Sequence, residues 1–544
     1  MYVREAIGQS LYDLGVRVAF GVVGSGNFHY TNALVGAGAR FVAGRHEGGS
    51  AVMADAYARM SDEVAVLSLH QGCGYTNALT GIVEAAKSQS PLLVLTAEAT
   101  DPKSNFYIDQ QSIAVGCGAV ALRVRSAETA IADLANAYRV CAEQRRTVVL
   151  NIPIDVQDHV LPGSASVTPP AARRAPRPQQ AELEQFVTLL AEAERPVFVA
   201  GRGARGGSAK QALVELAERS GALLATSAVS RGMFEGEQWC IDVAGGFSTP
   251  LAAELITGAD LIVGWGCALN MWTMRHGRLI GDDAKVVQVD IDQGAIGRHR
   301  PVDRALWAGN AETAADASAL LAETNESRAG YRTGDVLERI RTEGRWHQVP
   351  FDDVSTADRI DPRSMSAQLN RMLPASRVLS VDSGNFLGYP SMYLDVPDEY
   401  GFCFTQAFQS VGRGRATAVG AAIAQPDRLP IAGCGDGGFL MGISELETAV
   451  RLKLPLLVIV YNDSKYGAEV HHFGSDVPLD TVTFPDTDIA AIARGYGCDA
   501  ITVTNLDDLL PLKAWLDQPD RPMVLDAKVV SEDGAWWLVE AFGH

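Results

Sequence analysis

The chain has 544 residues, of which 47% are hydrophobic and 53 are glycine, so its composition excludes a disordered or fibrous protein. A single hydrophobic core does not normally serve so long a chain, which predicts about three domains of ordinary size. The net charge of −19 argues against nucleic acid or an anionic membrane as a partner, because like charges repel.

The first part of the chain, residues 1–163, alternates short apolar strands with helical segments. This pattern is typical of a doubly wound parallel sheet, in which the loops after the strands look into a cleft. Ser25 and His29 follow the first strand, and His70 follows the third. A histidine in such a loop can transfer a proton near neutral pH, and a structural histidine is the alternative. We expect strands at 19–23, 64–69, 92–96 and 147–152.

Glu47 stands between the predicted strand at 41–46 and a helix of small residues that runs to Arg59. Burial raises the pKa of a glutamate, and such a carboxyl group can share its proton with a ring nitrogen. The alternative is a glutamate that interacts with the positive end of a helix. Glu47 is therefore a candidate acid–base group.

The middle of the chain, residues 180–335, follows a proline-rich break at 162–178 and precedes a second break at 346–362. It contains the pattern Gly-x-Gly-x-x-Gly at 201–206, after a predicted strand and before a predicted helix at 208–220. The next strand, 222–227, ends without the acidic residue that binds a ribose, so a nicotinamide cofactor fits poorly. A tight structural turn is the alternative.

The last part, residues 360–544, again alternates strands and helices. The strand at 429–433 leads into Gly435-Asp436-Gly437, and the buried strand at 456–461 leads into Asn462, Asp463 and Lys465. Parallel strands place these segments side by side, with a helix predicted at 444–452. Glycine backbone can approach phosphate oxygens and Asp436 supplies a hard oxygen ligand, although a lone Gly-Asp-Gly often marks only a turn.

Asp463 follows Asp436 by 27 positions (463 minus 436). With this spacing the chain resembles the thiamine-diphosphate-dependent decarboxylase and acetohydroxyacid synthase family, whose motif is Gly-Asp-Gly followed at a distance by Asn-Asn. The resemblance covers nearly the whole chain and implies thiamine diphosphate and Mg²⁺ as cofactors. The implied metal ligands are Asp436, the side chain of Asp463 and the backbone carbonyl of Lys465. Asp463 stands where the family usually has its second asparagine, and Asn462 is a less suitable substitute.

The resemblance implies three doubly wound domains with parallel sheets. Residues 1–163 would bind the pyrimidine, residues 180–335 would form a Rossmann-like domain that binds FAD, ADP or nothing, and residues 360–544 would bind the diphosphate. Glu47 would touch the aminopyrimidine and shuttle the proton that activates the thiazolium carbon. Val411 stands where the family has a bulky apolar wedge. The other implied cofactor contacts are Ser25, Asn77, Gly384, Asn385, the Gln409 carbonyl, Gly435, Gly437, Gly438, Tyr466 and Gly467.

Substrate-facing residues resemble several members of the family. Ser25 and His70 look like benzoylformate decarboxylase, whereas His29 and Gln110 look like benzaldehyde lyase, with Gln110 bonded to a substrate oxygen. Glu469 stands where pyruvate decarboxylase-like members also have a glutamate that would control protonation, and a surface glutamate is the alternative. The segment 286–303 looks like acetohydroxyacid synthase, but Ala268 stands where acetolactate synthases place an arginine for the second oxo acid.

These features predict a lyase or transferase that makes or breaks a carbon–carbon bond next to a carbonyl in a 2-oxo acid, acyloin or 1,2-diketone. Three polar side chains, His29, His70 and Gln110, favour acyloin or diketone chemistry over simple decarboxylation. The alternatives are a 2-oxo acid decarboxylase, a diketone hydrolase and a non-catalytic regulatory homologue. A site shared by the first and last domains implies a homodimer at least, and a homotetramer is expected.

Eight scattered cysteines without a Cys-x-x-Cys pair predict reduced thiols. The N-terminus is charged where a signal peptide would be apolar, and the sequence has no apolar run of about 18 residues. We therefore expect a cytoplasmic enzyme.

Overall fold

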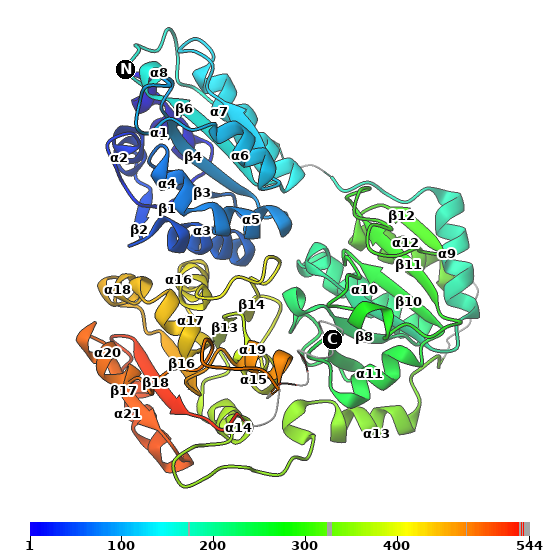
Figure 1. The fold of residues 1–544 in the computed structure, drawn as a ribbon. Coiled ribbons are helices and arrows are strands. Elements are labelled where there is room, and N and C mark those ends of the chain that lie inside the picture. Colours follow the sequence, from blue (N-terminus) through cyan, green and yellow to red (C-terminus); the bar gives the residue numbers. More distant parts are fainter. Residues whose placement is uncertain (172–173, 324–328, 475, 532–534, 536, 538–544) are drawn as a thin grey trace.

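The computed structural model of the chain describes residues 1–171, 174–323, 329–474, 476–531, 535 and 537 (Figure 1). These residues form three units, each built on a six-stranded sheet in which neighbouring strands are parallel. Helices connect the strands of each unit. The predicted α/β fold of three doubly wound parallel sheets is confirmed. Within the described part of the chain, no helix is both long and apolar enough to cross a membrane.

The first sheet has the strand order β2-β1-β3-β4-β6-β5. Every residue of β3 is buried, as expected for a central parallel strand covered on both faces. The strands are β1 (Val18–Gly21), β2 (Arg40–Ala43), β3 (Ala65–Leu69), β4 (Leu92–Glu98), β5 (Val120–Arg123) and β6 (Val148–Pro153). The helices are α1 (Val3–Asp13), α2 (Phe28–Gly36), α3 (Glu47–Ser61), α4 (Cys73–Asn77), α5 (Leu79–Lys87), α6 (Gln110–Gly116), α7 (Ala130–Gln144) and α8 (Ile154–Gln157).

The second sheet has the order β12-β11-β10-β7-β8-β9. Its strands are β7 (Pro196–Ala200), β8 (Leu223–Thr226), β9 (Cys240–Val243), β10 (Leu261–Trp265), β11 (Lys285–Asp290) and β12 (Arg304–Trp307). Its helices are α9 (Gln180–Glu192), α10 (Gly207–Ser220), α11 (Pro250–Thr257), α12 (Asn310–Glu323) and α13 (Gly334–Glu343). Short 3₁₀ turns lie at η1 (Arg202–Ala204), η2 (Ala228–Ser230), η3 (Arg275–Gly277) and η4 (Trp346–Gln348).

The third sheet has the order β14-β13-β15-β16-β18-β17, which repeats the order of the first sheet. Its strands are β13 (Arg377–Val381), β14 (Phe402–Cys403), β15 (Leu429–Gly435), β16 (Leu457–Asn462), β17 (Asp499–Val503) and β18 (Met523–Lys528). Its helices are α14 (Pro362–Met372), α15 (Gly388–Tyr393), α16 (Gly414–Ala424), α17 (Asp436–Met441), α18 (Ser444–Arg451), α19 (Gly467–Phe473), α20 (Ile489–Gly495) and α21 (Leu510–Asp517), with 3₁₀ turns η5 (Asn385–Leu387) and η6 (Leu506–Leu509).

The first and third units meet through α3 and α16, which face each other across the boundary in Figure 1. Small residues allow the two helices to approach closely. A Cβ atom added at Gly420 of α16 would lie 2.2 Å from the backbone oxygen of Met53 in α3. The small-residue character of the helix after Glu47 therefore serves domain packing.

One element differs from the sequence prediction. The chain turns directly from β15 into a separate short helix, α17, whose first residue is Asp436. The predicted helix at 444–452 is confirmed as α18, and α17 is an additional helix before it. The polypeptide therefore presents Asp436 at a helix start rather than in an open turn.

Candidate active site

Two carboxylates lie together at the carboxyl edge of the third sheet. Strands β15 and β16 pair so that Gly435 is opposite Tyr461, and Asp436 and Asp463 follow them. Asp436 is 7% exposed and Asp463 is 3% exposed, yet Oδ1 of Asp436 and Oδ2 of Asp463 have no hydrogen-bond partner. Burial and the charge of Asp463 raise the pKa of Asp436 to about 7.

This pair fits a hard cation. Two adjacent buried carboxylates with unpaired oxygens repel each other, and a divalent metal ion removes that cost by ligation. The backbone N–H of Lys465 donates to Oδ1 of Asp463 at 3.2 Å, which orients the carboxylate. Among the described residues no group of three or more His, Cys, Asp or Glu side chains is arranged to hold a metal. An ion here would therefore need further ligands, such as a backbone carbonyl and an anion.

The side chain of Asn462 does not compete with that of Asp463 as a metal ligand. Its amide nitrogen donates to Oδ1 of Asp526 at 2.8 Å and to the Thr487 carbonyl at 3.3 Å. The side chain is therefore used to hold β16 against β18 and the segment before α20. This arrangement favours Asp463 over Asn462 as the ligand.

Glycines form a narrow cradle around the pair. A Cβ atom added at Gly437 would lie 2.5 Å from the Tyr466 ring, and one at Gly467 would lie 3.1 Å from the Asn385 amide nitrogen. Gly384 has a φ of +104°, which side chains rarely adopt. Oδ1 of Asn385 is buried without a partner. The segments at 384–385, 435–438 and 466–467 thus converge, leaving exposed backbone suited to phosphate oxygens.

The loop from Phe404 to Arg413 passes beside this cradle. A Cβ atom added at Gly438 would lie 3.4 Å from Cγ1 of Val411, and Val411 is 39% exposed. Gln409 has a φ of +59°, a left-handed conformation that is uncommon for a residue other than glycine. The structure therefore brings Gln409 and Val411 next to the predicted diphosphate segment.

A second cluster lies in the first unit, at the start of α3. The Asn77 amide donates to Oε2 of Glu47 at 3.0 Å. His70 accepts the backbone N–H of Gly26 through Nδ1 at 3.2 Å, so its neutral form carries the proton on Nε2. Burial lowers the pKa of His70, and the charge of Glu47 opposes that shift. Glu47, His70 and Asn77 therefore form one polar group.

Ser25 and His29 are exposed at the rim of this cluster. A Cβ atom added at Gly24 would lie 2.7 Å from the His70 ring, so the loop that carries Ser25 runs against His70. His29 lies in the first turn of α2, where its ring packs edge-on against Phe28 at 5.6 Å. The two histidines are thus on neighbouring segments, and His29 is the more open to solvent.

Gln110 occupies a different setting from the one predicted. It is 2% exposed, and its side-chain oxygen accepts the Gly72 N–H at 2.9 Å. Its amide nitrogen donates to the Ala97 carbonyl at 3.1 Å and to the Asn151 side chain at 2.8 Å. Both the oxygen and the nitrogen of the Gln110 amide are therefore used in hydrogen bonds within the protein, which favours a structural role over contact with a substrate.

Tyr466 and Glu469 flank the metal segment. The Tyr466 ring packs edge-on against Phe484 at 4.7 Å and closes one side of Gly437. Glu469 is exposed on α19, and its carboxylate has no hydrogen-bond partner in the described part of the chain. It is free to face either solvent or a ligand above the cradle.

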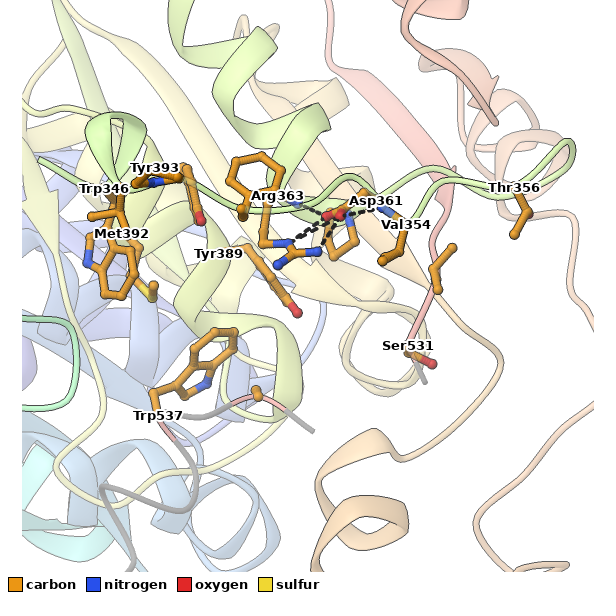
Figure 2. A pocket seen from close by; sticks show the side chains of 16 residues that line it. Trp346, Val354, Thr356, Asp361, Arg363, Tyr389, Met392, Tyr393, Ser531 and Trp537 are labelled. Atoms are coloured by element: carbon orange, nitrogen blue, oxygen red, sulfur yellow. Dashed lines mark hydrogen bonds and ion pairs between the residues drawn. The ribbon is translucent and has the colours of Figure 1, made fainter. Parts of the chain in front are cut away.

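A cavity of about 290 Å³ lies behind the cradle, between the segment 346–363, α15 and the chain after β18 (Figure 2). Figure 2 shows Tyr389, Tyr393 and Trp537 on one side of an ion pair between Arg363 and Asp361, whose atoms approach to 2.6 Å. Ser531 on its wall accepts a hydrogen bond from the Lys465 ammonium group at 3.4 Å. The cavity lining does not include Asp436, Asp463 or Glu47.

The two clusters remain separate in the single chain. Within the described residues, no hydrogen bond or ion pair joins Glu47 to Asp436, Asp463 or Val411. The two domains nevertheless contact each other beside Glu47. Glu445 accepts the backbone N–H groups of Arg45 and His46, and a Cβ atom added at Gly48 would lie 2.6 Å from Nη1 of Arg413. Among the described residues, Glu47 and the metal segment are therefore neighbouring polar clusters with no hydrogen bond or ion pair between them.

Three stretches that cover most of the chain match the thiamine pyrophosphate enzymes. Residues 1–114 match the N-terminal TPP binding domain, 183–317 the central domain and 382–527 the C-terminal TPP binding domain. The chain belongs to the thiamine pyrophosphate enzyme family. Its sheets and its resemblance to the decarboxylase and acetolactate synthase members are thereby explained.

Relatives of this thiamine pyrophosphate enzyme match nearly its full length. It is 24% identical to the acetolactate synthase isozyme 2 large subunit of Escherichia coli, over 96% of this chain and 95% of that protein. It is 27% identical to a sulfoacetaldehyde acetyltransferase of Alcaligenes xylosoxydans xylosoxydans, over 93% and 89%. The solved thiamine diphosphate-dependent 4-hydroxybenzoylformate decarboxylase of Rhodococcus jostii RHA1 shares its fold, with a TM-score of 0.79 at 21% identity, covering 97% and 99%.

The central domain of this thiamine pyrophosphate enzyme uses its glycine pattern for packing. The backbone N–H of Gly203 donates to the Gly266 carbonyl at 3.0 Å, and a Cβ atom at Gly201 would lie 2.3 Å from that oxygen. Arg202 and Arg205 turn away and donate to backbone carbonyls of Ser88 and Arg59 in the first domain. The loops after β7 and β10 thus touch each other, which favours a structural turn. FAD in this domain stays a prediction.

Sequence reasoning did not single out three buried acids that hold the site segments of this enzyme: Glu84, Asp382 and Glu445. Asp382 accepts the backbone N–H groups of Gly412 and Arg413, both at 3.1 Å. Glu84 is the one acidic residue of α5, with apolar residues on both sides of it, and that setting was the available signal. Their partners lie more than 300 positions away for Glu84 and Glu445, so no local pattern reveals them.

Proposed function

We propose that this chain is a thiamine diphosphate- and Mg²⁺-dependent enzyme that makes or breaks a carbon–carbon bond next to a carbonyl. Its substrates would be 2-oxo acids, acyloins or 1,2-diketones, and its favoured outcome is transfer of the cleaved fragment to a second carbonyl compound. When bound, thiamine diphosphate supplies a carbon that adds to a carbonyl and accepts the electron pair of the broken bond.

The observation that carries the proposal is the pair of unpartnered oxygens on Asp436 and Asp463. Buried polar atoms are normally bonded, so this pair calls for a cation in the working protein. The glycine segments at 384 and 435–438 lie beside it and expose backbone for a diphosphate. In this arrangement Asp436, Asp463 and the Lys465 carbonyl would hold Mg²⁺, and the metal would hold the diphosphate.

Proton transfer is assigned to the first domain. Glu47 would take and return a proton at the pyrimidine ring, with Asn77 orienting its carboxylate through the 3.0 Å hydrogen bond. His70 is held neutral and oriented by Gly26, so Nε2–H is the donor available to an oxygen of the substrate. His29 would act at the rim.

The sequence suggested three polar groups that could decide the reaction: His29, His70 and Gln110. The Gln110 amide is hydrogen-bonded within its own domain, so only the two histidines remain. His70 beside Glu47, with His29 on the segment that adjoins His70, still favours carbonyl addition, which needs protonation of a new alkoxide. Ala268, which is exposed after β10, offers no guanidinium for an acceptor carboxylate. An acceptor without a carboxylate therefore fits better than a second 2-oxo acid.

A site made of two half-sites calls for a second chain. We treat the Glu47 cluster and the Asp436 cradle as the two half-sites, because no hydrogen bond or ion pair of the described residues joins them, whereas the cofactor must touch both. A homodimer in which each chain supplies one half to the other satisfies this need, and pairing of two dimers would give the expected homotetramer.

The test has two stages. Calorimetry measures thiamine diphosphate binding with Mg²⁺ and with EDTA, and binding only with Mg²⁺ is expected. Pyruvate, benzoylformate, benzoin, acetoin and cyclohexane-1,2-dione are then supplied separately, and products are followed by mass spectrometry. Acyloin products support carboligation, aldehyde alone supports a decarboxylase, and ring-opened diketone supports a hydrolase. Binding without any turnover would favour a regulatory homologue, and absence of metal-dependent binding would overturn the proposal.

A further inference from the structure

The loop Phe404–Arg413 is fixed at both ends by carboxylates. At its far end, Asp382 of the same domain accepts the N–H groups of Gly412 and Arg413. At its near end the anchor comes from the first domain, where Glu84 accepts the N–H of Ala407 at 3.0 Å and that of Phe408 at 2.6 Å. Only residues 409–411 between these anchors have no such support.

Glu84 is an unusual anchor because it is a buried charge. It is 4% exposed on α5 and bonds to Arg59, whose Nη2 lies 2.7 Å from its Oε1. Burial alone would raise the pKa of Glu84, but the charge of Arg59 and the two backbone N–H groups hold it below its usual value. Arg59 also donates to the Phe404 carbonyl at 2.9 Å. Arg59 and Glu84 therefore hold the two ends of the segment 404–408 through hydrogen bonds to its backbone.

The segment that follows is strained. Gln409 adopts a φ of +59°, which persists in a residue other than glycine only where the surroundings enforce it. Its neighbour Phe408 is the residue whose N–H makes the shorter bond to Glu84. The backbone conformation of residues 409–411 is restricted on both sides. The N–H of Phe408 is fixed before this stretch, and those of Gly412 and Arg413 are fixed after it. The strain at Gln409 is thus held by the two anchors.

We propose that Glu84 is a positioning residue for the cofactor loop. Through Ala407 and Phe408 it sets the direction of the Gln409 carbonyl and the place of Val411, the two groups expected to meet the pyrimidine ring and the bend of the cofactor. The identity of that cofactor rests on the proposed function, whereas the anchoring of the loop rests on the contacts alone.

The discriminating variant is Glu84→Gln, which keeps the shape but offers only one acceptor oxygen and turns an NH₂ group toward a backbone N–H. Glu63→Gln is the matched control, because Glu63 is an exposed carboxylate in the same domain that accepts only the Tyr57 hydroxyl. Hydrogen exchange of the peptide 404–413 is measured without cofactor. It should become faster in Glu84→Gln and stay at the wild-type rate in Glu63→Gln.

With cofactor, Glu84→Gln should separate binding from turnover. Affinity for thiamine diphosphate with Mg²⁺ should stay within about threefold, because Asp436, Asp463 and the glycine cradle are untouched. The value of kcat should fall by roughly tenfold with little change in KM, as expected when a group acting in the reaction is misplaced. A merely structural role would leave kcat unchanged in the folded variant.

Unchanged exchange of 404–413, or unchanged kcat, in folded Glu84→Gln would overturn the inference. If Glu84→Gln does not fold, Glu84→Asp keeps the charge beside Arg59, shortens its reach, and should show the same two effects. A wild-type protein that fails to bind thiamine diphosphate would refute the proposed function, while the exchange measurement would still decide whether Glu84 anchors the loop.

Discussion

Glu445 and His46 are joined across 399 positions of sequence: Oε1 of Glu445 accepts the backbone N–H of His46 at 3.0 Å. The N–H of Arg45 donates to the same carboxylate, which is buried in α18. Glu47 is the next residue and begins α3. A carboxylate of the last domain therefore fixes the start of the helix that carries Glu47. Glu84 does the reverse, since it is in the first domain and fixes a loop of the last.

Glu445→Ala should reduce the free energy of unfolding by about 1–3 kcal/mol, because it removes the charged acceptor of two part-buried backbone N–H groups. Urea titration followed by circular dichroism measures the change. Glu447→Ala, two positions away, is the control, since Glu447 pairs with a half-exposed Arg45 and such pairs contribute about 0–1 kcal/mol. Equal losses in the two variants would contradict the anchoring role of Glu445.

Asp436→Asn should remove the metal-dependent stabilisation by thiamine diphosphate. At a ligand concentration of about 100 times Kd, the wild type should gain about 2.7 kcal/mol of stability. Asp436→Asn should lose most of this gain, because the hard anionic ligand is gone. Asp463→Asn should keep it, because an amide oxygen also ligates Mg²⁺ and the family usually has asparagine there. Thermal melts with Mg²⁺ and with EDTA measure this stabilisation in both variants. If Asp436→Asn were stabilised as much as the wild type, Asp436 would not be a metal ligand.

His70 should make stability depend on pH. Burial lowers the pKa of folded His70 below its usual 6.5, against the opposing charge of Glu47. As pH falls through the range just below 6.5, the unfolded chain takes up the proton first, so stability falls. His70→Gln lacks this pH-dependent contribution to stability. The unfolding free energy of the wild type minus that of the variant should therefore decrease from pH 7.5 to 5.5. The exposed His29 serves as control, and the same trend in His29→Gln would exclude His70 as the cause.

Gln110→Ala should act on stability rather than on the reaction. The variant leaves the N–H of Gly72 and the side-chain oxygen of Asn151 without a partner, which costs about 1–3 kcal/mol. The kcat/KM of the folded fraction should stay within about threefold of the wild type, since the amide does not reach a substrate. A large loss of kcat/KM in a variant of normal stability would restore Gln110 as a substrate contact.

The sequence predicts the fold and the metal segment because both depend on short-range patterns. Strand ends at 435 and 462 place Asp436 and Asp463 on one sheet edge, and parallel pairing makes that placement almost automatic. The setting of Gln110 could not be predicted, because its partners come from three separate segments at 72, 97 and 151. The same holds for Glu84 and Glu445, whose roles exist only once two domains have packed.

The two half-sites yield a prediction about assembly. Glu47→Gln alone and Asp436→Ala alone should each be inactive, because every site then lacks its proton-transfer group or its metal ligand. In a mixed dimer, the chain with Asp436→Ala still offers a native Glu47 to the native cradle of its partner, so one site of the two is complete. Co-refolded equal mixtures should therefore recover about a quarter of the wild-type activity, the share expected for random pairing in a twofold dimer. Wild type diluted with the double variant Glu47→Gln/Asp436→Ala controls for refolding losses. No recovery in the mixture, despite mixed dimers seen by native mass spectrometry, would mean that each chain uses its own Glu47.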